Sequence, residues 1–195
     1  MKPTLLLLGV AALVAACDTG SPIPTEASAP VPTAAMGRLD PEDLSPELMQ
    51  DLARARAATA QFQRDSVAFD ADYTFLFLDM CMENQPTGGM GYHYVNVGLL
   101  DSIVEVERPE ALMYEPGRNG QLRLVGLEYV IPADAWASAD APVLFGQELV
   151  LNDFGLWALH VWIWKNNPEG IFKDWNPTVN CENAPSTPST ARSHH

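Results

Sequence analysis

The stretch QLRLVGLEYVI, residues Gln121 to Ile131, decides the fold. Most of its residues are leucine, valine, isoleucine or tyrosine, a composition typical of a buried β-strand. The segment before it, Pro116 to Gly120, contains one proline, one asparagine and two glycines, which are typical of a hairpin loop. We therefore expect a hairpin whose other strand covers Ala111 to Tyr114.

Two further runs rich in valine, tyrosine, leucine and tryptophan flank this hairpin in the sequence. Tyr92 to Val97 precedes it and Trp157 to Lys165 follows it, and both are predicted to be strands. No helical pattern separates the four strands, so the sheet is expected to be mainly antiparallel.

A helix is predicted before the sheet. Ser45, Pro46 and Glu47 are typical of a helix start, with a capping hydroxyl, a proline in the first turn and an acid near the positive end of the dipole. Residues at spacings of four and three then form one amphipathic stripe: Leu48, Leu52, Ala55, Thr59, Phe62, Ser66, Phe69 and Tyr73. The predicted class is α+β, with a long N-terminal amphipathic helix, broken if anywhere near Ser66, packed on the sheet.

The composition divides the chain into four parts. Residues 1–16 are predicted to be a signal peptide and residues 17–40 a flexible tether rich in Pro, Ala, Ser and Thr. Residues 41–182 are enough for one globular domain with a single core. Residues 183–195 resemble the tether in composition and are predicted to be a disordered tail, which includes His194 and His195.

The N-terminal segment is typical of an exported bacterial lipoprotein. Lys2 supplies a positive start, Leu5 to Val14 is a short apolar run, and the sequence LVAAC ending at Cys17 resembles a lipobox. We expect Cys17 to be lipidated, which would anchor the domain to the cell membrane or the outer membrane and place it in the periplasm or outside the cell. An ordinary secretory signal, leaving Cys17 as a spare thiol, is the alternative.

The remaining cysteines, Cys81 and Cys181, form an even pair in a chain predicted to be exported. Exported proteins meet an oxidising environment, so we predict a disulfide between them. A pair of reactive thiols is the alternative, although the chain has no Cys-x-x-Cys motif.

The chain is acidic, with 25 Asp and Glu against 11 Lys and Arg and a net charge of −14. This charge argues against binding to nucleic acid or to anionic lipid headgroups by electrostatic attraction, because both need basic patches. Cationic partners and plain solubility both remain open as explanations.

Three predicted strands each carry a potential metal ligand among apolar neighbours: His93, Glu128 and His160. Two histidines and one carboxylate can hold a divalent metal with open coordination positions, as in catalytic zinc and non-haem iron sites. The sequence therefore raises the hypothesis of a site for zinc, iron, copper or manganese. A buried network of hydrogen bonds among these residues, without a metal, is the alternative.

Aromatic side chains accompany this candidate site. Tyr92 and Tyr129 adjoin two of its residues, and Trp162 and Trp164 follow the third, so all four are candidates for contact with a small ligand. Filling the core is the alternative role. If the protein is an enzyme, Tyr92 or Tyr129 is the candidate general acid or base.

Several motifs together resemble an uncharacterised family of exported bacterial proteins: GMGYHYVN (89–96), PEALMYEP (109–116), LVGLEYV (124–130), LHVWIW (159–164), NPEGIF (167–172) and the segment from WNP (175–177) to Cys181. The resemblance covers roughly residues 50 to 181. It implies one intact domain and an exported setting, and it supplies no catalytic residue.

The leading hypothesis is a membrane-anchored exported lipoprotein that binds a metal ion or small ligand on the face of the sheet carrying His93, Glu128 and His160. A metal-dependent enzyme, either a hydrolase or an oxygenase, is one alternative. A structural protein of the cell envelope that binds protein partners is another.

Overall fold

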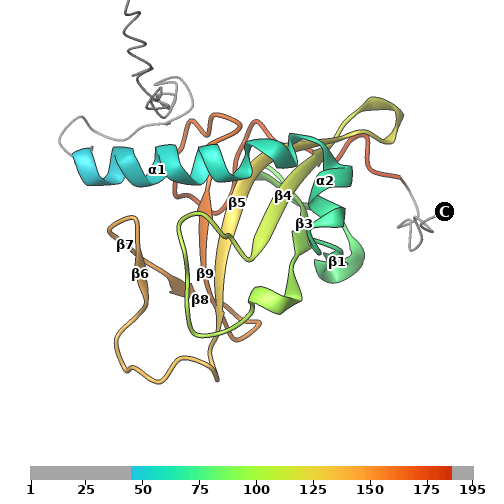
Figure 1. Cartoon of the computed structure of the whole chain (residues 1–195). Helices are drawn as coiled ribbons and strands as arrows, with labels where there is room; N and C mark the ends of the chain where they lie inside the picture. The colour runs from blue at the N-terminus through green and yellow to red at the C-terminus, as the bar shows by residue number, and fades with distance from the viewer. Residues whose placement is uncertain (1–44, 186–195) are drawn as a thin grey trace, which may run out of the picture.

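The computed structural model describes residues 45–185 (Figure 1). The predicted signal peptide, Cys17, the tether, and His194 and His195 in the tail lie outside these residues. No helix within residues 45–185 is long and apolar enough to cross a membrane.

The helical region consists of α1 (Pro46–Thr59), the 3-10 turn η2 (Ala60–Gln63) and α2 (Asp65–Asp70). The start is as predicted: the Ser45 hydroxyl accepts a hydrogen bond from the Leu48 amide at 3.1 Å. The helix does not run through the whole amphipathic stripe: it breaks at Arg64, close to the break considered near Ser66, where the backbone is extended with φ −99° and ψ 109°. The Phe62 carbonyl instead accepts a hydrogen bond from the buried Tyr114 hydroxyl at 2.7 Å. A tertiary hydrogen bond from Tyr114 thus replaces the helical hydrogen bond that the Phe62 carbonyl would otherwise accept.

A seven-stranded sheet with wholly antiparallel pairing forms the rest of the core, in the order β1-β3-β4-β5-β9-β8, with β2 also paired to β3. Its strands are β1 (Phe75–Leu76), β2 (Met82–Asn84), β3 (Gly88–Val95), β4 (Ala111–Pro116), β5 (Leu122–Pro132), β8 (Val150–Leu151) and β9 (Leu156–Val161). A separate hairpin pairs β6 (Val143–Leu144) with β7 (Gln147–Glu148). The mixed class and the mainly antiparallel sheet are therefore confirmed.

The four predicted strands correspond to β3, β4, β5 and β9, and the loop from Pro116 to Gly120 joins β4 to β5 as expected. Strand β9 ends at Val161, four residues before the predicted end, because the Trp162 amide turns to bond the Ile171 carbonyl. The two-residue and three-residue strands at the edges were not predicted, since they are too short to show an alternating pattern.

The two faces of the sheet have different roles. The helices cover the face that carries Tyr94 and Tyr114: the ring of Tyr94 contacts Phe69 of α2, and Tyr114 bonds the carbonyl of Phe62. Figure 1 shows α2 beside β3 and β4, with α1 lying across the same side of the sheet. The opposite face carries His93, Met113 and Gly126, which lie in register on β3, β4 and β5.

This second face is concave. His93 on β3 and His160 on β9 are three strand spacings apart, about 14 Å across a flat sheet whose side chains stand upright. Their Nε2 atoms nevertheless lie 3.4 Å apart. Phe77, after β1, and Phe154, after β8, also meet with ring centroids 5.1 Å apart, although they follow the two edge strands. The sheet therefore curls strongly towards the side that carries the histidines.

The C-terminal segment packs across the start of β3. Gly89 and Asn176 pair through two backbone hydrogen bonds of 3.1 and 3.0 Å. A side chain at Gly88 would collide with this segment, since an added Cβ would lie 2.3 Å from the Asn176 carbonyl oxygen. The predicted disulfide is confirmed, with Cys81 and Cys181 joined at 1.98 Å, and it ties the segment to β2.

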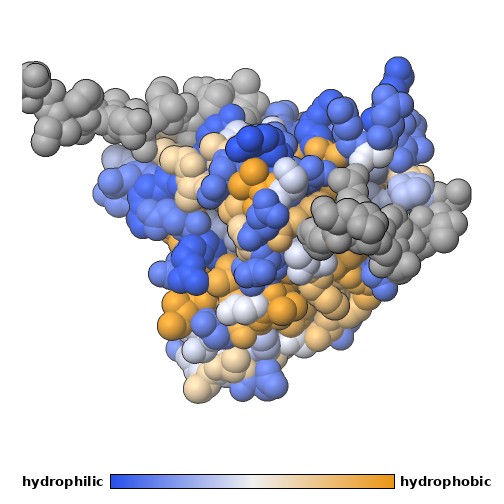
Figure 2. Space-filling view, turned by 45° about the vertical axis from the view of Figure 1, so that its right-hand side comes forward, coloured by the Kyte–Doolittle hydropathy of each residue, from blue (hydrophilic) through white to orange (hydrophobic). Residues whose placement is uncertain are grey.

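Apolar side chains also reach the surface. Figure 2 shows them gathered on the lower half of one face, beneath a mostly hydrophilic upper half. The most exposed large apolar residues are Phe75, Leu78, Met80, Val97, Ile103, Val143, Val150, Leu151 and Phe154.

Candidate metal centre

The three predicted ligands come together on the concave face. Glu128 lies directly opposite His160 in the pairing of β5 with β9, and the curl brings His93 towards both. The His93 Nε2 atom is 3.8 Å from one Glu128 carboxylate oxygen, and the His160 Nε2 atom is 3.6 Å from the other. One potential ligand atom from each of the three residues lies within 4.8 Å of the other two.

These distances are informative because they are longer than direct hydrogen bonds. Hydrogen bonds between such groups measure about 2.7–3.2 Å, whereas the cluster has separations of 3.4, 3.6 and 3.8 Å. Nitrogen and oxygen ligands about 2.0–2.2 Å from a tetrahedral zinc ion are themselves about 3.3–3.6 Å apart. The spacing therefore fits ligands around an ion better than side chains bonded directly to one another.

The cluster is almost closed to solvent. His93 and His160 are 2% and 6% exposed, and the Glu128 side chain is 13% exposed. Gly126 contributes to this close packing, because a Cβ there would lie 2.4 Å from the Met113 Cε atom and 3.2 Å from the ring of Trp162. Of the three residues, Glu128 is the most exposed to solvent.

His160 is oriented by two neighbours. Its Nδ1 atom lies 3.4 Å from an Asp174 carboxylate oxygen, and its ring stacks on Trp162 with an interplanar angle of 15°. A carboxylate behind a metal-binding histidine is a common arrangement, because it fixes which ring nitrogen faces the ion. The Nδ1 atom of His93, by contrast, is buried and has no hydrogen-bond partner within residues 45–185.

The electrostatic environment differs between the two histidines. Burial lowers the pKa of His93 to about 4, and the Glu128 charge offsets only part of that effect. Burial also acts to lower the pKa of His160, but the charge of Glu128 and the bond to Asp174 outweigh it, so the pKa is raised. The same contact with His160 lowers the pKa of Asp174.

The two tyrosines predicted to accompany the site lie on the other face of the sheet. Each is next in sequence to a ligand, and successive side chains of a strand point to opposite faces. The Tyr129 hydroxyl donates to the Val106 carbonyl at 2.7 Å, and burial raises its pKa well above the usual value. Tyr92 pairs with Tyr114 on the face beneath the helices. Neither side chain is therefore placed to act on a ligand at the metal cluster.

The two tryptophans have different positions. Trp162 is fully buried beside His160, and its indole N–H donates to the Lys173 carbonyl. Trp164 lies under α1, where its indole N–H donates to the Thr59 hydroxyl and the Arg56 guanidinium sits 4.1 Å over its ring. Only Trp162 belongs to the surroundings of the cluster.

Sequence reasoning missed Asp174 and the requirement for Gly126. Asp174 follows an irregular segment after β9, and no periodic pattern predicts that it turns back to His160. A glycine inside a strand can indicate a close approach of neighbouring atoms, so Gly126 did carry a usable signal.

No protein-family model, curated protein or solved structure matches this chain.

Proposed function

We propose that this protein binds a divalent transition metal ion through His93, Glu128 and His160. The observation that carries the proposal is the convergence of two buried histidines and one largely buried glutamate at separations of 3.4–3.8 Å, longer than the usual direct hydrogen bond and suited to a shared ion. Imidazole and carboxylate donors bind zinc, iron, copper and manganese, so these four metals are the candidates.

Burial of the carboxylate also supports a cation at this place. An ionised carboxylate in a poorly hydrated site is costly unless a positive charge or several hydrogen bonds compensate. Within residues 45–185, no lysine or arginine forms an ion pair with Glu128, whose ionic contacts are with His93 and His160. His160, whose pKa is raised, offers a compensating charge when it is protonated, and a divalent ion would supply that charge with both histidines neutral and free to act as ligands.

Metal analysis tests this proposal directly. Protein made without an added histidine tag would be stripped with a chelator, reconstituted with each of the four metals and assayed by mass spectrometry. We expect about one equivalent of the preferred metal, lost in His93→Ala, Glu128→Gln and His160→Ala. The chain supplies a matched control, because His194→Ala/His195→Ala removes the other two histidines and should leave the metal content unchanged. Substoichiometric binding of all four metals would refute the proposal.

Metal-dependent catalysis is a second candidate function. Three protein ligands leave a zinc or iron ion at least one position for water or substrate, and the partial exposure of Glu128 gives that position an opening. Tyr92 and Tyr129 are not candidates for the general acid or base, because their side chains lie on the opposite face of the sheet from the cluster. Turnover of activated esters, with loss in His93→Ala and retention in the double variant of the tail, would support a hydrolase.

We also propose that the protein is exported and anchored by a lipid on Cys17. The lipobox-like sequence and the confirmed disulfide support this placement, because disulfides persist mainly in oxidising compartments. Metabolic labelling with a palmitate analogue should mark the wild-type protein and spare Cys17→Ser. Cys81→Ser is the matched control and should keep the label; labelling of Cys17→Ser would contradict the anchor.

A further inference from the structure

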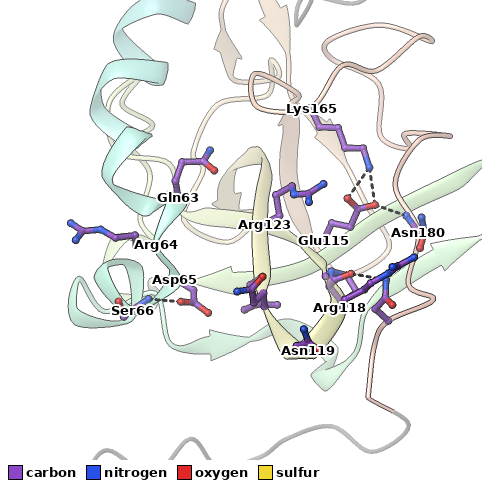
Figure 3. Close-up of a pocket in the computed structure, with 15 residues that line it drawn as sticks. Gln63, Arg64, Asp65, Ser66, Glu115, Arg118, Asn119, Arg123, Lys165 and Asn180 are labelled. Carbon is purple, nitrogen blue, oxygen red and sulfur yellow. Dashed lines mark hydrogen bonds and ion pairs between the residues drawn. The ribbon is translucent and has the colours of Figure 1, made fainter.

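A second site lies beside the β4–β5 hairpin. A hollow of about 840 Å³ is bounded by the junction of η2 with α2, by the hairpin and by the C-terminal segment (Figure 3). We call it the hairpin pocket, and define it by Asp65, Glu115, Arg118, Arg123, Lys165 and Asn180. It shares no residue with the metal cluster.

The hairpin pocket concentrates positive charge in an acidic protein. Residues 45–185 contain eight lysines and arginines, and four of them line this pocket: Arg64, Arg118, Arg123 and Lys165. The pocket has two acids, Asp65 and Glu115, so its lining carries a formal charge of +2. The chain as a whole carries −14.

Glu115 is already fully engaged. The Lys165 ammonium group donates to both of its carboxylate oxygens at 2.7 Å, and the Asn180 amide donates to one of them at 3.2 Å. Only a tenth of the Glu115 side chain is exposed. Its negative charge is thus neutralised by Lys165 and is not available to pair with the arginines of the pocket.

Arg123 consequently has no ion pair with Glu115, although the two residues face each other across the hairpin. It lies directly opposite Glu115 in the pairing of β4 with β5, a position where opposite charges normally attract each other. Neither Arg123 nor Arg118, at the hairpin tip, has an ion-pair partner within the described part of the chain. In Figure 3, Arg123 lies between the helical junction and the Lys165–Glu115 pair, whereas Arg64 points away.

We propose that the hairpin pocket binds a small anion carrying phosphate or carboxylate groups, held by Arg118 and Arg123. Guanidinium groups bind both kinds of anion through paired hydrogen bonds. The amide side chains of Gln63, Asn119 and Asn183 line the same pocket and supply further hydrogen-bonding groups. The net negative charge of the chain does not prevent binding, because charges beyond about 8–10 Å are largely screened at physiological salt.

Nuclear magnetic resonance titration tests this proposal, because it detects weak binding residue by residue. Inorganic phosphate and succinate would be added separately to metal-free protein at a fixed ionic strength of about 0.15 M, where distant charges are screened. We expect saturable shifts in the amide signals of Arg118, Gly120 and Arg123 with at least one of the anions. Saturation with phosphate alone identifies a phosphate site, and saturation with succinate alone identifies a carboxylate site.

Variants locate the binding. Arg118→Gln and Arg123→Gln should each weaken it about tenfold, the usual effect of losing a charge-assisted hydrogen bond. Arg54→Gln and Arg108→Gln are matched controls, since these arginines are exposed, paired elsewhere and outside the pocket. The proposal is overturned if neither anion gives saturable shifts, or if the control variants weaken binding as much. Either failure would leave the metal proposal unaffected.

Discussion

The carboxyl group of Glu110 accepts a hydrogen bond from the backbone amide of Val130 at 2.9 Å, in a position where Glu110 is only 2% exposed. This bond links the residue before β4 to Val130, near the C-terminal end of β5. Burial raises the pKa of Glu110 to about 8, with smaller contributions in the same direction from Asp101 and Glu128.

The stability of the protein should therefore depend on this carboxyl group between about pH 4.5 and 8. The folded state retains the proton up to pH 8, whereas the unfolded chain loses it near pH 4.5. The stabilisation is fully present below pH 4.5 and is lost as the pH rises through 8, by at most about 1.4 kcal/mol per pH unit.

Glu110→Gln should remove this dependence, because the amide keeps an oxygen acceptor for Val130 but does not titrate. Urea unfolding at pH 5 and pH 8 measures the effect. We expect the free energy of unfolding to fall less in the variant than in the wild type. Equal falls in the two proteins would show that Glu110 titrates normally.

Asp174→Asn should weaken metal binding by about 10–100-fold, the range seen when the partner of a metal-binding histidine is lost. The amide still occupies the space beside His160 but no longer carries a charge. Competition with a chromogenic chelator measures the affinity. Glu169→Gln, an exposed acid in the same segment, removes the same charge and should leave the affinity within about twofold.

Gly126→Ala should disturb the metal cluster while leaving most of the fold. The added methyl group would collide with Met113 and press on Trp162, which stacks on His160. We expect a loss of about 1–3 kcal/mol of stability from overpacking, together with reduced metal content. Gly98→Ala is the control, because Gly98 is exposed, its φ is not positive, and an added Cβ would press only on the Asn96 side-chain oxygen, at 3.2 Å. A variant with full metal content would show that this contact is not important for the site.

Removing the disulfide should lower the stability substantially. Cys81 and Cys181 are 100 residues apart, and closing a loop of that length restricts the unfolded chain by up to about 4.7 kcal/mol. Cys81→Ser/Cys181→Ser should melt at a lower temperature than the oxidised wild type, and the wild type with a reducing agent should match the variant. No change on reduction would contradict this expectation.

The sequence indicated the three candidate ligands because they follow a local rule. His93, Glu128 and His160 each sit within a run of apolar residues, and alternation along a strand is visible in one segment at a time. Whether the three strands bring them together depends on the strand order and on the curl of the sheet. Neither property is encoded in a short pattern, so the sequence left both the buried network and the metal site open.

The helix break and the hairpin pocket depend on tertiary contacts in the same way. The stripe through Phe62 is regular, and only the hydroxyl of Tyr114, 52 residues later, competes for its carbonyl. The predicted hairpin is enough to place Arg123 opposite Glu115. The ion pair between Glu115 and Lys165, however, involves a segment 50 residues away. The periodicity of a sequence cannot predict contacts between residues so far apart in the chain.

The bond between Cys81 and Cys181 encloses His93, Glu128, His160 and Asp174 within one covalent loop. A protease that cuts the chain once between the two cysteines would leave two fragments that stay joined. All the proposed ligands would remain on the same molecule, and the antiparallel pairing of β3, β4, β5 and β9 could hold them in register. If the protein is exported as proposed, this covalent loop would keep the proposed site on one molecule after a single cut by an external protease.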